Sequence, residues 1–212
     1  MDFPNRINKY LRDKGFASRR EADELIARGE VLVNGKPAQR GMMIGAKDTV
    51  ELKQKEQKEY VYLAYHKPLG LATQAPVNQE SVITQWAGKG IFPVGRLDKE
   101  SEGLLLLTND RRITAAVLDA QIEKEYIVHT AEKLRAGIPA ILQKGMQTKT
   151  FGKLLPAHAE IIGDRELRVI LREGKRHQIR VMLAELGYTV TGLKRVRISK
   201  VRLGNLAPGQ TR

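Results

Sequence analysis

The chain has 212 residues, of which 42% are hydrophobic, so it is long enough for two domains with buried cores. It contains no cysteine, which excludes disulfides and thiolate metal sites. Its longest apolar run is far shorter than the roughly 20 residues of a membrane-spanning helix, and the formal net charge is +13. We therefore expect a cytoplasmic protein without a membrane segment.

The excess positive charge lies at the two ends of the chain. Residues 1–58 contain 13 basic and 9 acidic side chains, residues 59–164 contain 12 of each, and residues 165–212 contain 12 basic and 3 acidic ones. Basic segments on both sides of a neutral middle are typical of a protein that holds a polyanion. The alternative is a generally basic protein. A membrane surface is less favoured, because the basic residues are not gathered on one amphipathic helix.

The first part of the chain predicts a small domain. Its expected elements are a helix over 6–14, a helix over 18–28, a strand that runs into an Asn-Gly turn over 31–38, and a strand over 49–52. Ser18 and Glu21 have the spacing of a capping box that begins the second helix, and Gly29 ends it. Residues 53–58 are all polar and predict a linker.

From residue 59 onward the pattern mixes helices and strands. The expected strands lie at 60–65, 104–107, 126–129 and 167–172, with further strands after 187. The expected helices lie at 111–118, 133–144 and 175–186, and loops are expected at 66–70 and 72–80.

Residues 95–109, with the sequence GRLDKESEGLLLLTN, hold the most informative motif. Asp98 follows Arg96 in a polar loop that leads directly into four leucines. A continuous apolar run of this length predicts a buried strand, so the loop is attached to a rigid element. By itself, an aspartate near an arginine is more often a surface ion pair than a catalytic group.

This run resembles the signature loop of the pseudouridine synthases, and the KPLG, KEY and EGKRHQIR sequences resemble further motifs of that family. Ser18-Arg19-Arg20, Gly29 and Val33-Asn34-Gly35 resemble the S-four RNA-binding domain of the branch that modifies ribosomal RNA. The resemblance covers nearly the whole chain, although residues 74–81 match poorly. It implies an α+β fold: an S-four-like domain at 1–52, a linker at 53–58, and at 59–212 a catalytic domain with a mixed, mainly antiparallel sheet and flanking helices.

The reaction of this family breaks the bond between uracil and ribose, turns the base and joins carbon 5 to the sugar, and it requires no metal or organic cofactor. The resemblance makes Asp98 the catalytic carboxylate, acting either as a nucleophile or as a base on the sugar. It makes Tyr126 the ring that packs on uracil and Arg180 the cation that pairs with Asp98. Arg96 matches a residue that fills the space left by the flipped base.

Arg176 and Arg180 lie four residues apart on the predicted helix and so share a face, which is repulsive unless an anion lies opposite; an ordinary basic helix face is the alternative. Cations that contact phosphates add affinity and salt dependence rather than base specificity. The candidate RNA-binding residues are Arg96, Arg176, His177, Arg6, Lys9, Arg19, Arg20, Lys194 and Arg195.

We therefore predict a monomeric enzyme that flips one uridine out of a ribosomal RNA stem-loop and isomerises it. Large-subunit RNA is favoured over small-subunit RNA. Two competing hypotheses remain from the sequence. One is a non-catalytic RNA-binding or ribosome-assembly factor on the same scaffold, and the other is a general binding module for structured RNA that functions mainly through residues 1–58.

Overall fold

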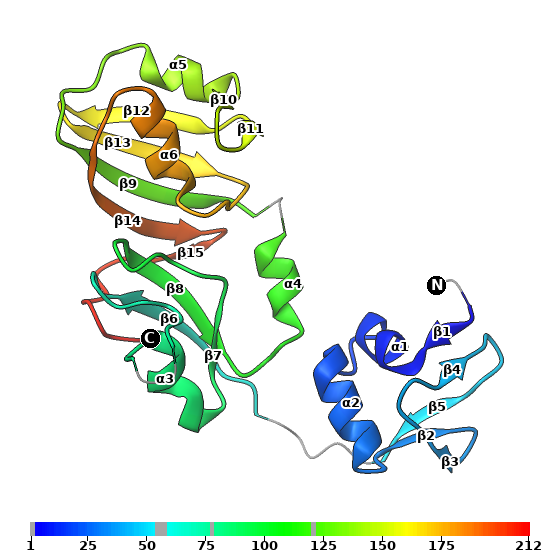
Figure 1. Cartoon of the computed structure of the whole chain (residues 1–212). Helices are drawn as coiled ribbons and strands as arrows, with labels where there is room; N and C mark the ends of the chain where they lie inside the picture. The colour runs from blue at the N-terminus through cyan, green and yellow to red at the C-terminus, as the bar shows by residue number, and fades with distance from the viewer. Residues whose placement is uncertain (1–2, 54–58, 77–78, 120–121) are drawn as a thin grey trace. The chain divides into compact units, whose positions relative to one another are not determined.

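The computed structural model describes residues 3–53, 59–76, 79–119 and 122–212 (Figure 1). It divides into two compact units. The first runs to Tyr60 and includes Asp110–Thr114, and the second consists of Val61–Asn109 and Ala115–Arg212. Most of the linker predicted at 53–58 lies outside the described residues.

The first unit combines helices α1 (Ile7–Asp13) and α2 (Arg19–Ala27) with two small sheets. The sheets are β3 (Lys36–Pro37), β2 (Val31–Val33) and β5 (Val50–Leu52) in that order, and β1 (Asn5–Arg6) paired with β4 (Met43–Ile44). The predicted cap is present, because the Ser18 hydroxyl accepts a hydrogen bond from the Glu21 amide at 3.2 Å. The predicted turn is present too, with φ of +52° at Asn34 and +75° at Gly35.

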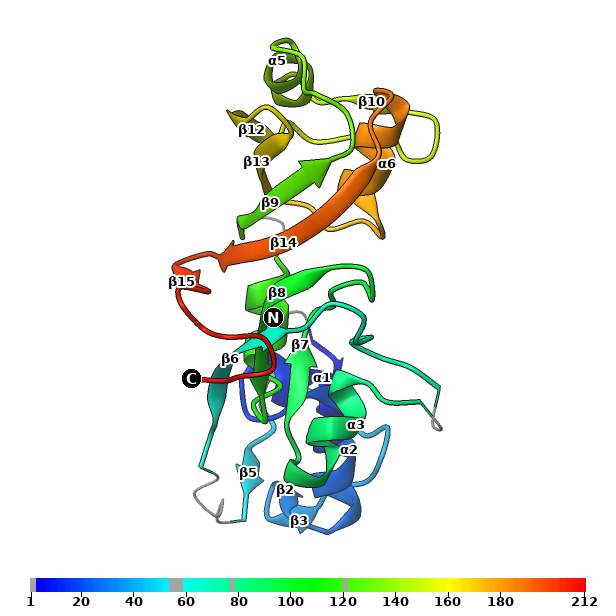
Figure 2. The ribbon, with the colours of Figure 1, turned by 90° about the vertical axis from the view of Figure 1, so that its left-hand side faces the viewer.

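One mixed sheet forms the centre of the second unit (Figures 1 and 2). Its strands, in spatial order, are β12 (His158–Gly163), β13 (Glu166–Leu171), β9 (Lys124–Thr130), β14 (Val190–Ile198), β8 (Glu102–Thr108) and β6 (Tyr62–Lys67). The short strands β7 (Phe92–Val94) and β15 (Val201–Arg202) pair with β8 and β14. Every pair is antiparallel except β14 with β8, which agrees with the predicted fold class.

Helices cover the two halves of this sheet separately. α5 (Ile138–Gln143) and α6 (Gln178–Glu185) pack on one face of the half formed by β12, β13, β9 and β14, around a shared apolar core. The other half, β6 and β8, packs on α3 (Val82–Trp86) and, through Ala64 and Leu104, on Ile198 and Leu203. The remaining elements are η1 (Ala87–Lys89), α4 (Ile113–Leu118), and the hairpin of β10 (Gln147–Thr148) and β11 (Gly152–Lys153).

The two halves are joined by the short parallel pairing of β14 with β8, which involves only Lys194 with Glu102 and Arg195 with Gly103. Gly103 has a φ of +109°, and a Cβ at this position would lie 2.3 Å from the Arg195 carbonyl oxygen. Only glycine allows the strands to approach this closely. The joint therefore depends on one residue without a side chain.

Several boundaries differ from the prediction. β6 continues to Lys67, so His66 and Lys67 are buried strand residues rather than part of a loop. α6 begins at Gln178 and not at residue 175, because His177 adopts a left-handed conformation that a right-handed helix cannot contain. Arg176 therefore does not share a helix face with Arg180. Pattern reasoning also missed the short elements β1, β4, α3, η1, β7, β10 and β11, and the six-residue strand β12.

Candidate functional site

A cleft of about 1040 Å³ opens in the second unit, close to the joint between β14 and β8. Its walls are the segment 94–101, the first half of β9, the connection 171–179 between β13 and α6, and parts of β14 and of 72–74. A volume of this size is at the upper end of the range for small-ligand pockets. It brings together Asp98, Arg96, Tyr126, Arg176, His177 and Arg195 of the predicted site.

The loop that carries Asp98 is held by its main chain. Five consecutive residues, 96–100, form hydrogen bonds through their main chain. Side chains bind three of them: Arg195 Nη1 donates to the Arg96 carbonyl (3.3 Å), Thr73 Oγ1 bonds to the Leu97 amide and carbonyl (3.0 and 2.6 Å), and Arg180 Nη2 donates to the Glu100 carbonyl (2.6 Å). Main-chain amides bind the other two: Ser101 donates to the Asp98 carbonyl (3.1 Å) and Gly70 to the Lys99 carbonyl (2.9 Å). The loop backbone is therefore fixed on both sides of the carboxylate.

The Asp98 side chain is 30% exposed, and its Oδ1 lies 3.3 Å from His177 Nε2. The prediction that Arg180 pairs with Asp98 is not met, since no ion pair joins these two described residues. Arg180 instead donates to the carbonyls of Val190 and Glu100. It reaches the aspartate through the main chain of the loop, while the imidazole of His177 faces the carboxylate directly.

Tyr126 is the aromatic residue of the cleft, and it is only 9% exposed. It lies on β9, where its neighbour on β14 is Arg195. Between Arg195 and Arg197 the register shifts, as in a β-bulge, so that Arg197 pairs with Glu125 instead. The shift leaves Arg195 facing the cleft, while Arg197 interacts with glutamates that alternate with Lys124 and Tyr126 along β9.

Arg195 was predicted to contact RNA, but only 4% of it is exposed. Its Nε donates to the Leu104 carbonyl at 2.7 Å and its Nη1 to the Arg96 carbonyl, so one guanidinium holds both ends of the Asp98 loop. Its Nη2 is buried without a partner among the described residues. Arg195 is therefore not a surface residue that contacts phosphate, as predicted, but a buried residue that supports the Asp98 loop.

Two buried lysines accompany this arginine. Lys67 is fully buried, and its ammonium donates to the carbonyls of Pro68 and Leu71. Burial lowers the pKa of Lys67 to about 8, although the charges of Asp98 and Glu100 act in the opposite direction. Burial also lowers the pKa of Lys124, and the charge of Arg195 adds to that effect. Sequence reasoning did not assign a role to either lysine.

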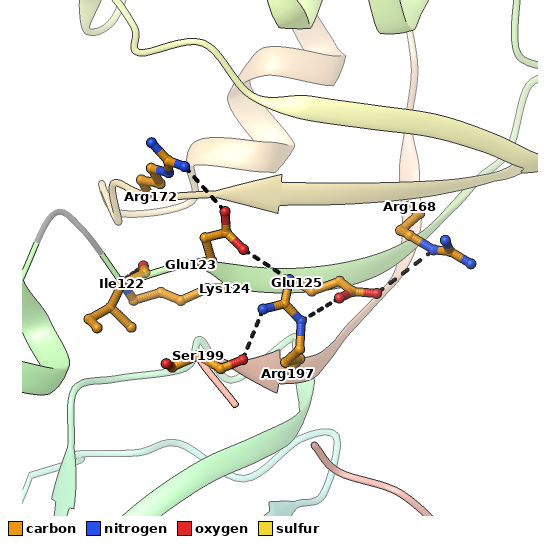
Figure 3. A network of polar contacts seen from close by, with 8 residues as sticks. All are labelled: Ile122, Glu123, Lys124, Glu125, Arg168, Arg172, Arg197 and Ser199. Atoms are coloured by element: carbon orange, nitrogen blue, oxygen red, sulfur yellow. Dashed lines mark hydrogen bonds and ion pairs between the residues drawn. The ribbon is translucent and has the colours of Figure 1, made fainter. Parts of the chain in front are cut away.

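Much of the positive charge of the C-terminal segment is neutralised within the fold. Arg197 donates to Glu125 at 2.6 Å and to Glu123 at 3.3 Å, and Figure 3 shows its guanidinium between the two glutamates. Arg172 bonds to Glu123, and Arg168 lies 3.8 Å from Glu125. These hydrogen bonds hold the pKa of Glu123 below its usual range, the one from Arg197 contributing most. The network joins β9, β13 and β14.

The other predicted RNA contacts are distributed over both units. Arg96 and Arg176 are exposed and line the cleft, whereas Lys194 lies outside the cleft, 3.8 Å from Glu102. In the first unit, Arg6, Arg19 and Arg20 are exposed and Lys9 is half-buried. None of these four has an ion pair with a residue that the structure describes.

Sequence reasoning missed Thr73 and Leu193, which also line the cleft. Leu193 precedes Arg195 by two residues and could have been found from strand alternation, but no local signal marks Thr73. Within the described parts of the chain, no helix is long and apolar enough to cross a membrane. The same residues contain no group of three or more metal-binding side chains of the His, Cys, Asp or Glu type.

Comparison with known proteins gives matches for both units. Residues 61–185 match the family described as RNA pseudouridylate synthase, and residues 5–50 match the S4 domain. A dual-specificity RNA pseudouridine synthase, RluF of Salmonella typhi, is 36% identical over 100% of this chain and 76% of its own length. The ribosomal large subunit pseudouridine synthase B of Bacillus subtilis is 31% identical over 98% of this chain and 91% of its own. A crystal structure of a pseudouridylate synthase superposes with a TM-score of 0.72 at 26% identity, covering 98% of this chain and 94% of that one.

Proposed function

The chain belongs to the RNA pseudouridylate synthase family, and we propose that it isomerises a specific uridine of large-subunit ribosomal RNA with Asp98 as the catalytic group and without a cofactor. The observation that carries this proposal is the cleft, which holds a rigidly supported, partly exposed carboxylate together with Tyr126. The large-subunit preference is supported by the relative from Bacillus subtilis. We also propose that residues 1–52 form the S-four-like RNA-binding domain and residues 59–212 the catalytic domain.

The reaction conserves every atom of the nucleotide. The bond from uracil N1 to ribose C1′ breaks, the base turns within the cleft, and a bond from C5 to C1′ forms. The proton on C5 leaves, and N1 gains a proton. The catalyst must therefore hold an ionised carboxylate next to the sugar, retain a detached base and accept the C5 proton.

Asp98 fits the first requirement, either as a nucleophile or as a base on the sugar. Here Lys67, Lys124 and Arg195 supply buried positive charge around the site, and His177 lies beside the carboxylate. Arg180 supports Asp98 through the Glu100 carbonyl.

Tyr126 fits the second requirement, because its ring lies in the cleft wall and can pack on the detached uracil. It would also take part in removing the C5 proton. Arg96, exposed at the cleft, would occupy the space that the flipped nucleotide leaves in the stem-loop. Flipping costs a few kcal/mol of unstacking, which contacts to the RNA backbone offset.

The S-four domain would supply many of these contacts. Arg6, Lys9, Arg19 and Arg20 have no competing ion pair with a described residue, so they can bind phosphates. Arg176, His177 and Lys194 would add contacts near the cleft. A monomer that binds one stem-loop is the simplest assembly of this kind.

The test is pseudouridine mapping of total RNA from a strain that lacks the gene, complemented with the wild-type protein or with Asp98→Asn. The substitution is nearly isosteric, so the fold and RNA binding are expected to survive. Total RNA is used because one relative is a dual-specificity enzyme.

We expect one large-subunit site to disappear in the deletion strain, to return with the wild-type protein and to stay absent with Asp98→Asn. A site in small-subunit RNA would correct the target. Modification by the Asp98→Asn protein would overturn the role of the aspartate. If no site changes, the chain acts as a non-catalytic RNA-binding factor.

A further inference from the structure

We propose that Thr73 is a positioning residue for the reaction, because its hydroxyl fixes the main chain of Leu97 and thereby the neighbouring Asp98. The inference rests on the proposed role of Asp98. It assigns a function to a residue for which neither the motifs nor the comparisons provide one.

The Thr73 hydroxyl makes two hydrogen bonds with the same residue. Thr73 Oγ1 accepts a hydrogen bond from the Leu97 amide at 3.0 Å and donates to the Leu97 carbonyl at 2.6 Å. Thr73 is 3% exposed and Leu97 is 6% exposed, so water cannot easily replace either bond. The Thr73 hydroxyl thus satisfies both main-chain hydrogen-bonding groups of Leu97, as a neighbouring strand would in a sheet.

Thr73 can hold the loop because its own segment is held. The Val82 amide donates to the Ala72 carbonyl at 3.0 Å, and the Ile83 amide donates to the Thr73 carbonyl at 3.2 Å. Both donors lie at the start of α3, which packs on β6 and β8 through Val82 and Trp86. Leu97 is therefore connected, through Thr73 and the start of α3, to the apolar core that α3 forms with β6 and β8.

The other side-chain supports of the loop act on other residues. Arg195 holds the Arg96 carbonyl and Arg180 holds the Glu100 carbonyl, whereas Thr73 acts on the residue directly before Asp98. Loss of the hydroxyl would leave the Leu97 amide and carbonyl buried without partners. The local main chain would then move to find new ones, and the carboxylate would move with it.

The test compares Thr73→Val with Thr73→Ser. Valine keeps the shape and removes the hydroxyl, while serine keeps the hydroxyl. Thr148→Val is the matched control, because Thr148 is also 3% exposed and its hydroxyl also accepts from a main-chain amide (Phe151, 3.0 Å) and donates to a carbonyl (Gly152, 3.1 Å). Its hairpin does not line the cleft.

Four quantities are measured for each protein: the single-turnover rate of tritium release from ribosomal RNA that carries 5-tritiated uridine, the dissociation constant for that RNA, the melting temperature, and hydrogen exchange of the segment that contains Leu97. We expect Thr73→Val to lower the rate by about 10- to 100-fold, since small misplacements of a catalytic group have effects of this size. RNA affinity should stay within about twofold. Exchange at Leu97 should become faster.

Thr73→Ser should retain the rate within about threefold, the range expected where the positioning bonds survive. Thr148→Val should lower the melting temperature but leave the rate unchanged. A folded Thr73→Val protein with the wild-type rate would overturn the proposal, as would Thr73→Ser behaving like Thr73→Val. If Thr73→Val does not fold, Thr73→Cys, whose thiol is a weak hydrogen-bonding group, is judged by the same criteria.

Failure of the proposed function would be recognised separately. In that case the wild-type protein would itself release no tritium, and mapping would find no modified site. Hydrogen exchange at Leu97 would still decide whether Thr73 holds the loop. Unchanged exchange in Thr73→Val would then overturn the inference without any measurement of activity.

Discussion

Replacement of Gly103 by alanine should damage both the stability of the second unit and its activity. The new Cβ would lie 2.3 Å from the Arg195 carbonyl oxygen and 2.8 Å from the Arg195 amide nitrogen. These are backbone atoms of β14, which cannot rotate away as a flexible side chain could. Alanine at a φ of +109° would also be strained in any surroundings.

The expected cost follows from these two effects. Holding a residue with a Cβ in this region of φ costs about 1–3 kcal/mol. Relief of the clash requires β8 and β14 to separate by roughly 1 Å, because unbonded C···O contacts are normally about 3.3 Å or longer. Such a movement breaks the short parallel pairing, and each buried main-chain group left without a partner costs about 1–3 kcal/mol. With one such group the sum is about 2–6 kcal/mol, a large fraction of the 5–15 kcal/mol that stabilises a typical domain.

Urea denaturation, followed by circular dichroism, measures this loss directly. Gly137→Ala is the control, because Gly137 has an ordinary φ of −75° and a Cβ added there would have no other atom within 4 Å. It should stay within about 1 kcal/mol of the wild type. If Gly103→Ala unfolds at the same urea concentration as Gly137→Ala, the joint between β14 and β8 does not have the importance assigned to it.

Three further predictions concern the buried cations and the RNA contacts. Arg195→Met should lower the free energy of unfolding by about 2–3 kcal/mol, because two carbonyls lose a charged donor, and a wild-type midpoint in urea would contradict this. The pKa of Lys67 is about 8 in the folded protein and 10.5 as its ordinary value, so between these limits the unfolded chain binds more protons and stability rises with pH. The free energy of unfolding of the wild type, relative to Lys67→Met, should increase by about 3 kcal/mol from pH 8 to pH 10.5. If the difference between the two proteins does not change with pH, the pKa of Lys67 is not lowered in the folded protein. Replacement of Arg19 and Arg20 by alanine should weaken RNA binding and reduce the slope of log K against log salt by about 1–2, whereas an unchanged slope would show that neither contacts phosphate.

The sequence predicted elements whose signals are local. The leucine run at 104–107 became the buried centre of β8, and the capping pair of Ser18 and Glu21 begins α2 as expected. In both cases the periodicity or the cap is contained in a few consecutive residues. Tertiary contacts do not contradict these preferences, so the local signal was sufficient.

Features that depend on distant contacts were predicted wrongly or not at all. Strand alternation places Arg195 and Arg197 on one face of β14, but the register shift between them separates the two faces. The basic residues before Gln178 look like the first turn of a helix, yet His177 leaves the helical conformation and its imidazole faces Asp98. Neither the bulge nor the left-handed residue has a signature in the neighbouring sequence.

The site combines a main chain held by hydrogen bonds with an unusual distribution of charge. Because the loop is supported through its carbonyls and amides, the exposed side chains of Lys99 and Glu100 can vary without moving Asp98. The cations beneath it have no such freedom. Lys67, Lys124 and Arg195 are almost fully buried, and none forms an ion pair with a carboxylate among the described residues. Burial of a charge has a desolvation cost, and here main-chain carbonyls rather than carboxylates offset it, so the presence of three such cations argues for a functional benefit. The benefit we propose is a positive potential beneath the Asp98 loop that attracts the RNA backbone.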